Sequence, residues 1–353
     1  MKFFSGEVHP IRWPRLLFIS FLGLSLLFAC STGADEEGNR SAVSTDLSVS
    51  DQIAEYTGQI NANRMNATAF HKRAQLYLFD RNLGSAMDDI AVAIKIDDKV
   101  ADYHYTLSDV HFAGGNVVLA TEALADGLQL DPENVHALLA QAQLYYALRD
   151  MKNSVVTLKR VLEVDKHNAK AYLIHGLIFS ELGDTTRAMN SFQTAVENDP
   201  QLEEAHLELG LIHYAELNPL AVNYLDNVIA LNPQNTLAMY TKSMYYQKTS
   251  EVDLAIDGYN QILGVNPNHA ESHYNLGHIQ IEFKEDYKGA VAHFSNAIKA
   301  DSTHYKAFYM RGVSLERQTM YPEARRDYLK SLDLQTNYEL AIQGLNRLDK
   351  LGQ

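Results

Sequence analysis

Cysteine is almost absent from this chain of 353 residues, in which Cys30 is the only one. A single cysteine excludes a disulfide framework and any multi-cysteine metal site. A long polar tract is also missing, and the composition is 46% hydrophobic, 21% charged and 10% aromatic. These values are typical of a folded body, so they exclude disorder, collagen and a polytopic membrane protein.

Positive charge is scarce as well. Lys and Arg together number 30 against 44 Asp and Glu, which gives a net charge of −14. The first 29 residues hold three basic residues and one acidic residue, so the remainder carries −16. Because a phosphate backbone repels an acidic surface, we expect no nucleic acid among the partners.

The start of the chain is typical of an export signal. Lys2, Arg12 and Arg15 precede an apolar run, residues 16–29, that holds no charge and is short for a membrane span. The run ends in Leu27-Phe28-Ala29-Cys30, which resembles the lipobox of bacterial lipoproteins. That resemblance implies cleavage after residue 29 and acylation of Cys30, palmitate included. An ordinary secretory signal and an uncleaved anchor are the alternatives.

Residues 31–50 are rich in Ser, Gly, Thr and Asp and show no apolar period, which predicts a flexible linker. Such a linker averages roughly 25 Å and stretches to about 70 Å. By resemblance to Gram-negative lipoproteins, Ser31 after the cysteine implies sorting to the outer membrane. Asp35-Glu36-Glu37 resembles a surface-export tag of some lipoproteins, or is simply part of the linker. Periplasmic and surface exposure both stay open.

From about residue 51 the chain repeats, and eight aligned segments span residues 67–338. Their bounds are 67–100, 101–134, 135–168, 169–202, 203–235, 236–269, 270–304 and 305–338. Six have 34 residues, and the one-residue changes in the fifth and seventh fall between two predicted helices. Apolar residues recur at intervals of three and four, which predicts paired amphipathic helices, and no useful alternating strand pattern is present.

Three positions of the period are nearly uniform. The eighth is always small, namely Ala74, Ser108, Ala142, Gly176, Gly210, Ser243, Gly277 and Gly312. The twentieth is Ala86, Ala120, Ser154, Ala188, Ala221, Ala255, Ala290 and Ala324. The twenty-fourth is bulky, namely Ile90, Leu124, Leu158, Phe192, Leu225, Tyr259, Phe294 and Tyr328. This register predicts two helices in close approach with one large side chain filling each layer.

The pattern resembles the tetratricopeptide repeat. Residues 272–277 (SHYNLG) nearly reproduce that family's first-helix signature, and residues 181–184 (ELGD) its turn. The usual Trp at position four is replaced by other, mostly aromatic residues. The resemblance implies an all-α solenoid, a right-handed superhelix with a concave and a convex side. Residues 51–66 and 339–353 are predicted as capping helices with polar outer faces.

Catalytic and metal sites have little support in the sequence. There is no Gly-rich phosphate loop, no nucleophile elbow and no Cys–His pair, so we expect neither an enzyme nor a cofactor. His269 and His273, four residues apart, are the best candidates for metal ligands. Third and fourth ligands are not identifiable, and His104, His206 and His273 recur at repeat position four, a packing slot. We therefore predict no metal site.

In this family the concave side binds ligands through positions two, five, six, nine and twelve of the first helices. The candidate groove residues here are Tyr105, Leu139, Leu173, Leu177, Leu207, Leu211, Tyr240, Met244, Tyr274 and Tyr309. An apolar middle and a Tyr-lined end suit an amphipathic helix or an extended apolar peptide. The alternative is that the leucines pack against neighbouring helices, since one turn of register separates lining from core.

The family's clamp for chaperone tails is poorly matched. Asn275 and Lys306 fit two of its slots, but Tyr240, Met244 and Met310 fill the others. We therefore expect an outer-membrane lipoprotein that binds protein or peptide partners as an adaptor in a secretion, gliding or cell-wall-processing assembly. Self-association into a scaffold, as a homo-oligomer, is the alternative.

Overall fold

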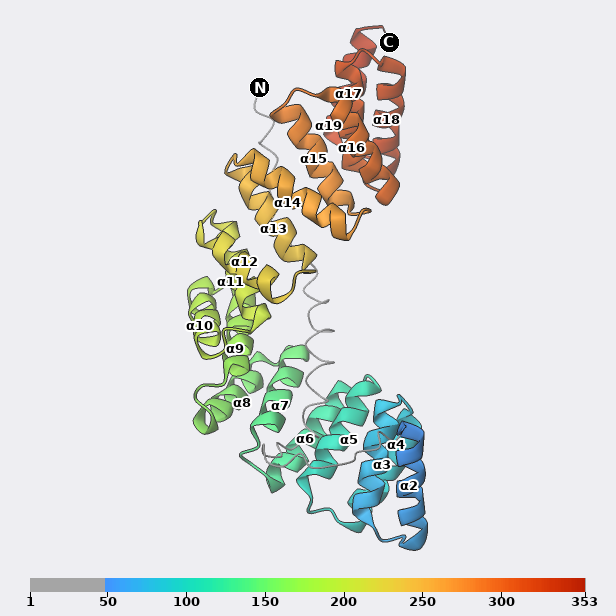
Figure 1. Ribbon diagram of the computed structural model, residues 1–353, viewed down its shortest axis with the longest axis vertical. Helices are drawn as coiled ribbons and strands as arrows, with labels where there is room; N and C mark the ends of the chain where they lie inside the picture. Colours follow the sequence, from blue (N-terminus) through green and yellow to red (C-terminus); the bar gives the residue numbers. More distant parts are fainter. Residues whose placement is uncertain (1–47, 353) are drawn as a thin grey trace. The chain divides into compact units, whose positions relative to one another are not determined.

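The computed structural model describes residues 48–352 (Figure 1). The predicted signal peptide, Cys30 and almost all of the linker lie outside the described residues. Every regular element within them is an α-helix, which confirms the all-α prediction. No helix among them is long and apolar enough to cross a membrane.

The helices form sequential antiparallel pairs between two single helices. The first single helix is α2 (Val49–Ala62) and the last is α19 (Glu339–Lys350). The pairs are α3 (Ala67–Phe79) with α4 (Leu83–Ile96), α5 (Ala101–Ala113) with α6 (Val117–Leu130), α7 (Val135–Ala147) with α8 (Met151–Val164), α9 (Ala169–Glu181) with α10 (Thr185–Asn198), α11 (Glu203–Ala215) with α12 (Leu220–Leu231), α13 (Thr236–Lys248) with α14 (Val252–Val265), α15 (Ala270–Glu282) with α16 (Tyr287–Ala300), and α17 (Tyr305–Arg317) with α18 (Tyr321–Leu334). The first helix of every pair begins where a sequence segment begins.

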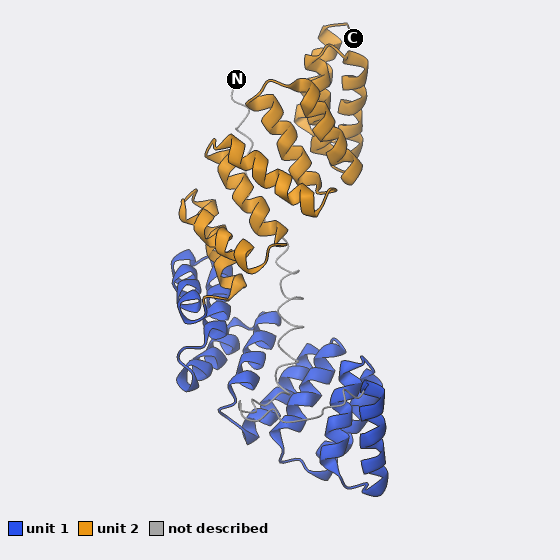
Figure 2. Cartoon of the chain, in the orientation of Figure 1, with its two compact units in different colours: residues 1–199 blue, residues 200–353 orange. Residues whose placement is uncertain are grey.

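The chain divides into two compact units, residues 1–199 and 200–353 (Figure 2). In the first, the described helices run from α2 to α10, and in the second from α11 to α19. Within each unit a helix packs mainly against its neighbours along the chain. Each core is therefore a stack of thin layers, as expected for repeats.

The uniform positions of the period form the core of both units. Small residues at positions eight and twenty and bulky residues at position twenty-four are all buried. Position twenty-seven, which the sequence reasoning did not single out, is also fully buried, from Ala93 in the first repeat to Ser331 in the last. Its side chains lie one turn after the bulky residue on the same helix face.

Helix starts and stops are set locally. Asn66, Asn134, Asn168 and Asn235 each accept a hydrogen bond from the third backbone N–H of the following helix. The turn inside each pair contains a residue in the left-handed region, which is Gly183 in the fourth repeat, with φ 78°, but Thr319 in the eighth, with φ 61°. This turn fixes how the second helix folds back on the first.

Candidate functional site

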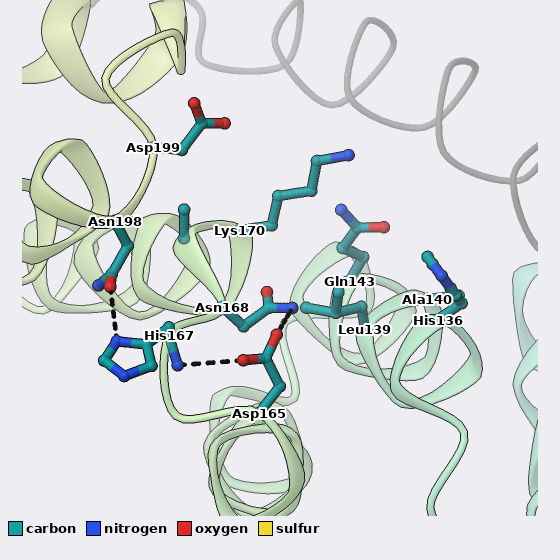
Figure 3. Close-up of a pocket in the computed structure, with 11 residues that line it drawn as sticks. His136, Leu139, Ala140, Gln143, Asp165, His167, Asn168, Lys170, Asn198 and Asp199 are labelled. Carbon is teal, nitrogen blue, oxygen red and sulfur yellow. Dashed lines mark hydrogen bonds between the residues drawn. The ribbon is translucent and has the colours of Figure 1, made fainter. Parts of the chain in front are cut away.

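Unit 1 contains a hollow of about 440 Å³ beside the first helix of the third repeat (Figure 3). Its walls come from α7, the α8–α9 loop, the start of α9 and the end of α10. The lining residues are His136, Leu139, Ala140, Gln143, Asp165, His167, Asn168, Ala169, Lys170, Asn198 and Asp199. The four from α7 occupy positions two, five, six and nine, which are the positions expected to line the concave side.

One rim of the hollow is held in place by its own hydrogen bonds. Asp165 accepts the backbone N–H of His167 at 3.1 Å and the side-chain amide of Asn168 at 2.9 Å. The His167 ring nitrogen Nδ1 lies 2.9 Å from Oδ1 of Asn198, to which it donates (Figure 3). Asn168 also caps α9 through the N–H of Ala171. These bonds fix the loop before any ligand arrives.

Three polar side chains of the hollow have no partner among residues 48–352. They are His136, Gln143 and Lys170, and the ends of Gln143 and Lys170 extend toward the same open side (Figure 3). Below them Leu139 and Ala140 form a buried apolar floor. An apolar base with a few free donors and acceptors is the usual composition of a ligand site. The hollow is therefore suited to a short stretch of peptide.

The structure places the predicted groove residues at two depths. Tyr105, Leu139, Leu173, Leu207 and Tyr309 are buried, whereas Leu177, Leu211, Tyr240, Met244 and Tyr274 are half-buried. Leu139 is the one of them that lines the hollow. Because the three position-five leucines are buried, a ligand can contact little of their surface. The half-buried residues leave part of their surface accessible to a ligand. Binding by these residues stays a prediction.

In unit 2 the position-five tyrosines are covered by aromatic rings from the loops. The ring of Tyr240 lies 5.5 Å from that of His269, and the ring of Tyr274 lies 4.8 Å from that of His304. The Tyr309 ring lies 5.4 Å from the Tyr338 ring, which comes from the residue before α19. The position-five tyrosines of unit 2 thus each form an aromatic pair with a residue that directly precedes a first helix or α19.

Two of these rings also cap helices. Nδ1 of His269 accepts the N–H of Ser272 at 3.2 Å, and Nδ1 of His304 accepts the N–H of Ala307 at 3.1 Å. A ring nitrogen accepts only when it carries no proton, so both histidines are neutral here. Burial is the main cause that lowers the pKa of each, and His278 beside Tyr274 has its pKa lowered to about 4 by burial.

The two histidines considered as metal ligands have other partners in the structure. His269 caps α15, and Nε2 of His273 donates to the carbonyl of Pro267 at 3.1 Å. The described part of the chain contains no group of three or more His, Cys, Asp and Glu side chains placed to hold a metal ion. Asn275, from the clamp comparison, donates to the hydroxyls of Tyr240 and Tyr259.

Sequence reasoning missed two parts of these surfaces. Aromatic residues end the sixth, seventh and eighth repeats, which are also repeats with Tyr at position five, and this coincidence could have predicted the ring pairs. The polar members of the hollow, Gln143 and Lys170, carry no comparable signal. Their significance depends on the absence of a partner, which only the fold reveals.

The comparisons with known proteins identify the repeat type. One tetratricopeptide-repeat model matches residues 135–168 and 169–202, and another tetratricopeptide-repeat model matches residues 282–339. The fold defined above is therefore an all-α tetratricopeptide-repeat solenoid. Proteins of this type generally bind protein or peptide partners, and the fold is typically a non-enzymatic interaction scaffold.

The individual relatives are distant. DnaJ homolog subfamily C member 7 of Homo sapiens is 23% identical over 304 residues, which cover 78% of this chain and 61% of that protein. This chain thus spans less than two thirds of the length of that relative. Among solved structures, the C-terminal part of a TPR repeat-containing protein from Cytophaga hutchinsonii has a TM-score of 0.57 at 18% identity, with 67% of this chain and 98% of that chain covered.

A second solved structure gives the same picture. The pilF protein of Pseudomonas aeruginosa has a TM-score of 0.51 at 19% identity, and the match covers 58% of this chain and 94% of that chain. At such identities the similarity shows the fold alone. The partner and the cellular role have to be argued from the residues of this chain.

Proposed function

We propose that this chain is an outer-membrane lipoprotein whose repeats serve as an adaptor for protein partners in an envelope assembly. Acylated Cys30 is the anchor, and the linker gives the repeats their reach. The proposed assemblies are those of secretion, gliding or cell-wall processing. Support for the anchor comes from the lipobox-like residues 27–30, and support for binding comes from the repeat type.

The observation that carries the binding role is the hollow of unit 1. Its rim is fixed by internal hydrogen bonds, its floor is apolar, and Gln143 and Lys170 are free to bond a ligand. The cost of ordering a site is small when the rim is already held. A peptide segment that offers carbonyl groups fits these donors.

Crosslinked capture from membranes, quantified by mass spectrometry, tests this role. We expect Lys170→Glu to reduce the recovery of specific partners at least about tenfold, which corresponds to roughly 1.4 kcal/mol. Lys166→Glu is the matched control, because Lys166 is an exposed lysine in the α8–α9 loop, four residues before Lys170, and does not line the hollow. Equal recovery of the same proteins with both variants contradicts the assignment.

The anchor has its own test. Cys30→Ser is expected to release the protein from the membrane fraction, and retention there indicates an uncleaved apolar anchor instead. Protease added to intact cells distinguishes surface exposure, which leads to digestion, from a periplasmic location, which leads to protection. Self-association is measured separately, as a mass that rises with concentration of the purified protein alone.

A further inference from the structure

Asp109 in α5 is a buried acid without a partner. Its side chain is 6% exposed, and it forms no hydrogen bond or ion pair with any residue between 48 and 352. The two other buried aspartates behave differently: Asp89 and Asp327 are each held by a forked arginine, Arg73 and Arg311 respectively. Burial of an unpaired carboxyl group opposes folding, so packing alone gives no reason for an aspartate at this site.

The repeat register places Asp109 on the ligand side of unit 1. In α7 the positions two, five, six and nine line the hollow, and the residue at position nine is Gln143. Asp109 holds position nine one repeat earlier, and Gln75 holds it one repeat before that. Three successive first helices thus carry an amide, a carboxyl group and an amide at the same place.

The carboxyl group also reaches the surface. Within the described part, the solvent-inaccessible side-chain nitrogen and oxygen atoms without a hydrogen-bond partner are Nδ1 of His104, His213, His273 and His293 and Oγ of Ser108. Neither oxygen of Asp109 is among them. Because these oxygens also have no partner, the carboxyl group is deep but not completely enclosed.

The surroundings of Asp109 leave it uncharged for much of the time. Burial alone raises its pKa to about 8. The helices α3, α4 and α6 pack against α5, and burial is the one cause of the shift, without a contribution from any of their charged or titratable groups, which include His71, Lys72, Arg73, Asp88, Asp89, Lys95, Glu122 and Asp126. His71 itself is bonded to Thr106 and is kept neutral by burial, which lowers its pKa to about 4.

We propose that Asp109 anchors a basic side chain, lysine or arginine, of the protein that binds unit 1. The proposal rests on the adaptor function and names the chemistry of its partner. A cation at this position pairs with the Asp109 carboxylate in a place where water is scarce. The ion pair offsets the desolvation cost of the carboxylate, which has no partner in the free protein. The net charge of −14 favours the approach of a basic segment.

The flanking amides support an extended segment around that anchor. A side-chain amide bonds both the N–H and the C=O of a peptide backbone. Gln75 and Gln143 are therefore suited to hold the chain on either side, while Asp109 selects the side chain. Norleucine or glutamate at the central place gives no ion pair, which makes the site selective for charge as well as shape.

Binding of pooled peptides to the mature full-length chain tests the proposal. The probes are short degenerate peptides with a fixed central lysine, arginine, norleucine or glutamate, measured by fluorescence anisotropy. We expect the basic pools to bind at least about tenfold more tightly than the norleucine pool. Asp109→Asn is expected to abolish this preference, whereas Asp126→Asn, the same change at an exposed position of α6, retains it.

The pH dependence gives a readout that a structural role does not produce. Because the free carboxyl group has a pKa of about 8, affinity for the basic pools rises about tenfold per pH unit below 8 and levels off above it. Asp109→Asn is expected to fold and to unfold at a higher temperature than the wild type, since it removes a buried acid. Loss of binding in a variant of raised stability cannot be attributed to misfolding.

Two results overturn the proposal: no preference of the wild type for basic pools, or a preference that survives in Asp109→Asn. The crosslinking experiment separates this failure from failure of the adaptor function. If Asp109→Asn keeps the partners that Lys170→Glu loses, Asp109 is not the anchor and the adaptor function stands. If neither variant loses partners, the binding role of unit 1 is refuted.

Discussion

Gly176 in α9 offers a sharp test of how the layers are packed. A Cβ atom at this position lies 2.5 Å and 2.6 Å from two ring carbons of Phe192, the bulky residue of the same repeat. Carbon atoms in contact are normally 3.5–4.0 Å apart, so the ring has to retreat by about 1 Å. Phe192 is fully buried, and close-packed interiors leave little room for such a shift. Gly176→Ala therefore overpacks the layer.

The magnitude follows from two opposing effects. Overpacking costs about 1–3 kcal/mol, whereas alanine in place of glycine inside a helix contributes about 1 kcal/mol of stability. Gly58→Ala isolates the second effect, since Gly58 lies exposed in α2 with no atom within 4 Å of a built Cβ. We expect Gly176→Ala to be less stable than Gly58→Ala by about 1–3 kcal/mol, measured by urea unfolding followed by far-UV circular dichroism.

A compensating substitution tests the mechanism itself. The third repeat pairs Ala142 with Leu158 at the equivalent positions, and both are buried. Phe192→Leu should therefore restore most of the stability lost by Gly176→Ala, with a coupling energy of about 1–2 kcal/mol. If Gly176→Ala stabilises as much as Gly58→Ala, or if the double variant is no better than the sum of its parts, the size-matching argument is wrong.

Three further predictions address local strain, acid sensitivity and ion pairing. Thr319→Gly should raise stability by about 0.5–1 kcal/mol in urea unfolding, because Thr319 has φ 61° where the fourth repeat has Gly183, and Gly183→Thr should lower it. Burial lowers the pKa of His71 and His278 to about 4, so their contribution to stability is complete above about pH 6.5 and is lost as the pH falls from 6.5 toward 4. The free energy of unfolding should fall by roughly several kcal/mol between pH 7 and pH 4. The variant His278→Phe should show a weaker dependence of this free energy on pH. Asp327→Ala should destabilise unit 2 by roughly 2–4 kcal/mol, because it leaves the half-buried Arg311 without its carboxylate. Arg326→Ala, which removes the exposed ion pair with Glu323, should change stability by less than about 1 kcal/mol.

The sequence was sufficient for the fold because each repeat encodes the same layer. Ala188 and Phe192 occupy the register positions that make two helices approach, and the same pattern occurs in all eight segments. A signal repeated at a fixed period averages out local exceptions such as α12, which is two residues shorter than the second helices of the other pairs. Helix starts were predictable for the same reason, since the capping side chains recur at the segment boundaries.

The binding surface could not be predicted to the same extent. Leu173 at position five is buried, and Leu177 one turn later is half-buried, although both were assigned to the groove from the same pattern. A shift of one helix turn changes a lining residue into a core residue, and that shift depends on how neighbouring layers are rotated. The repeat period determines which positions share a helix face. How deeply each side chain is buried depends on the packing of its own layer.

The distribution of unpaired polar groups distinguishes structural positions from binding positions in unit 1. Asp89 is buried and accepts two hydrogen bonds from the half-buried Arg73, which also donates to Thr57, so these side chains are accounted for by contacts within the protein. Asp109 and Lys170 have no such partner, although both stand at positions that face the expected ligand side. Because an unpaired buried acid lowers stability more than a paired one, this asymmetry supports the proposal that another molecule supplies the partner of Asp109.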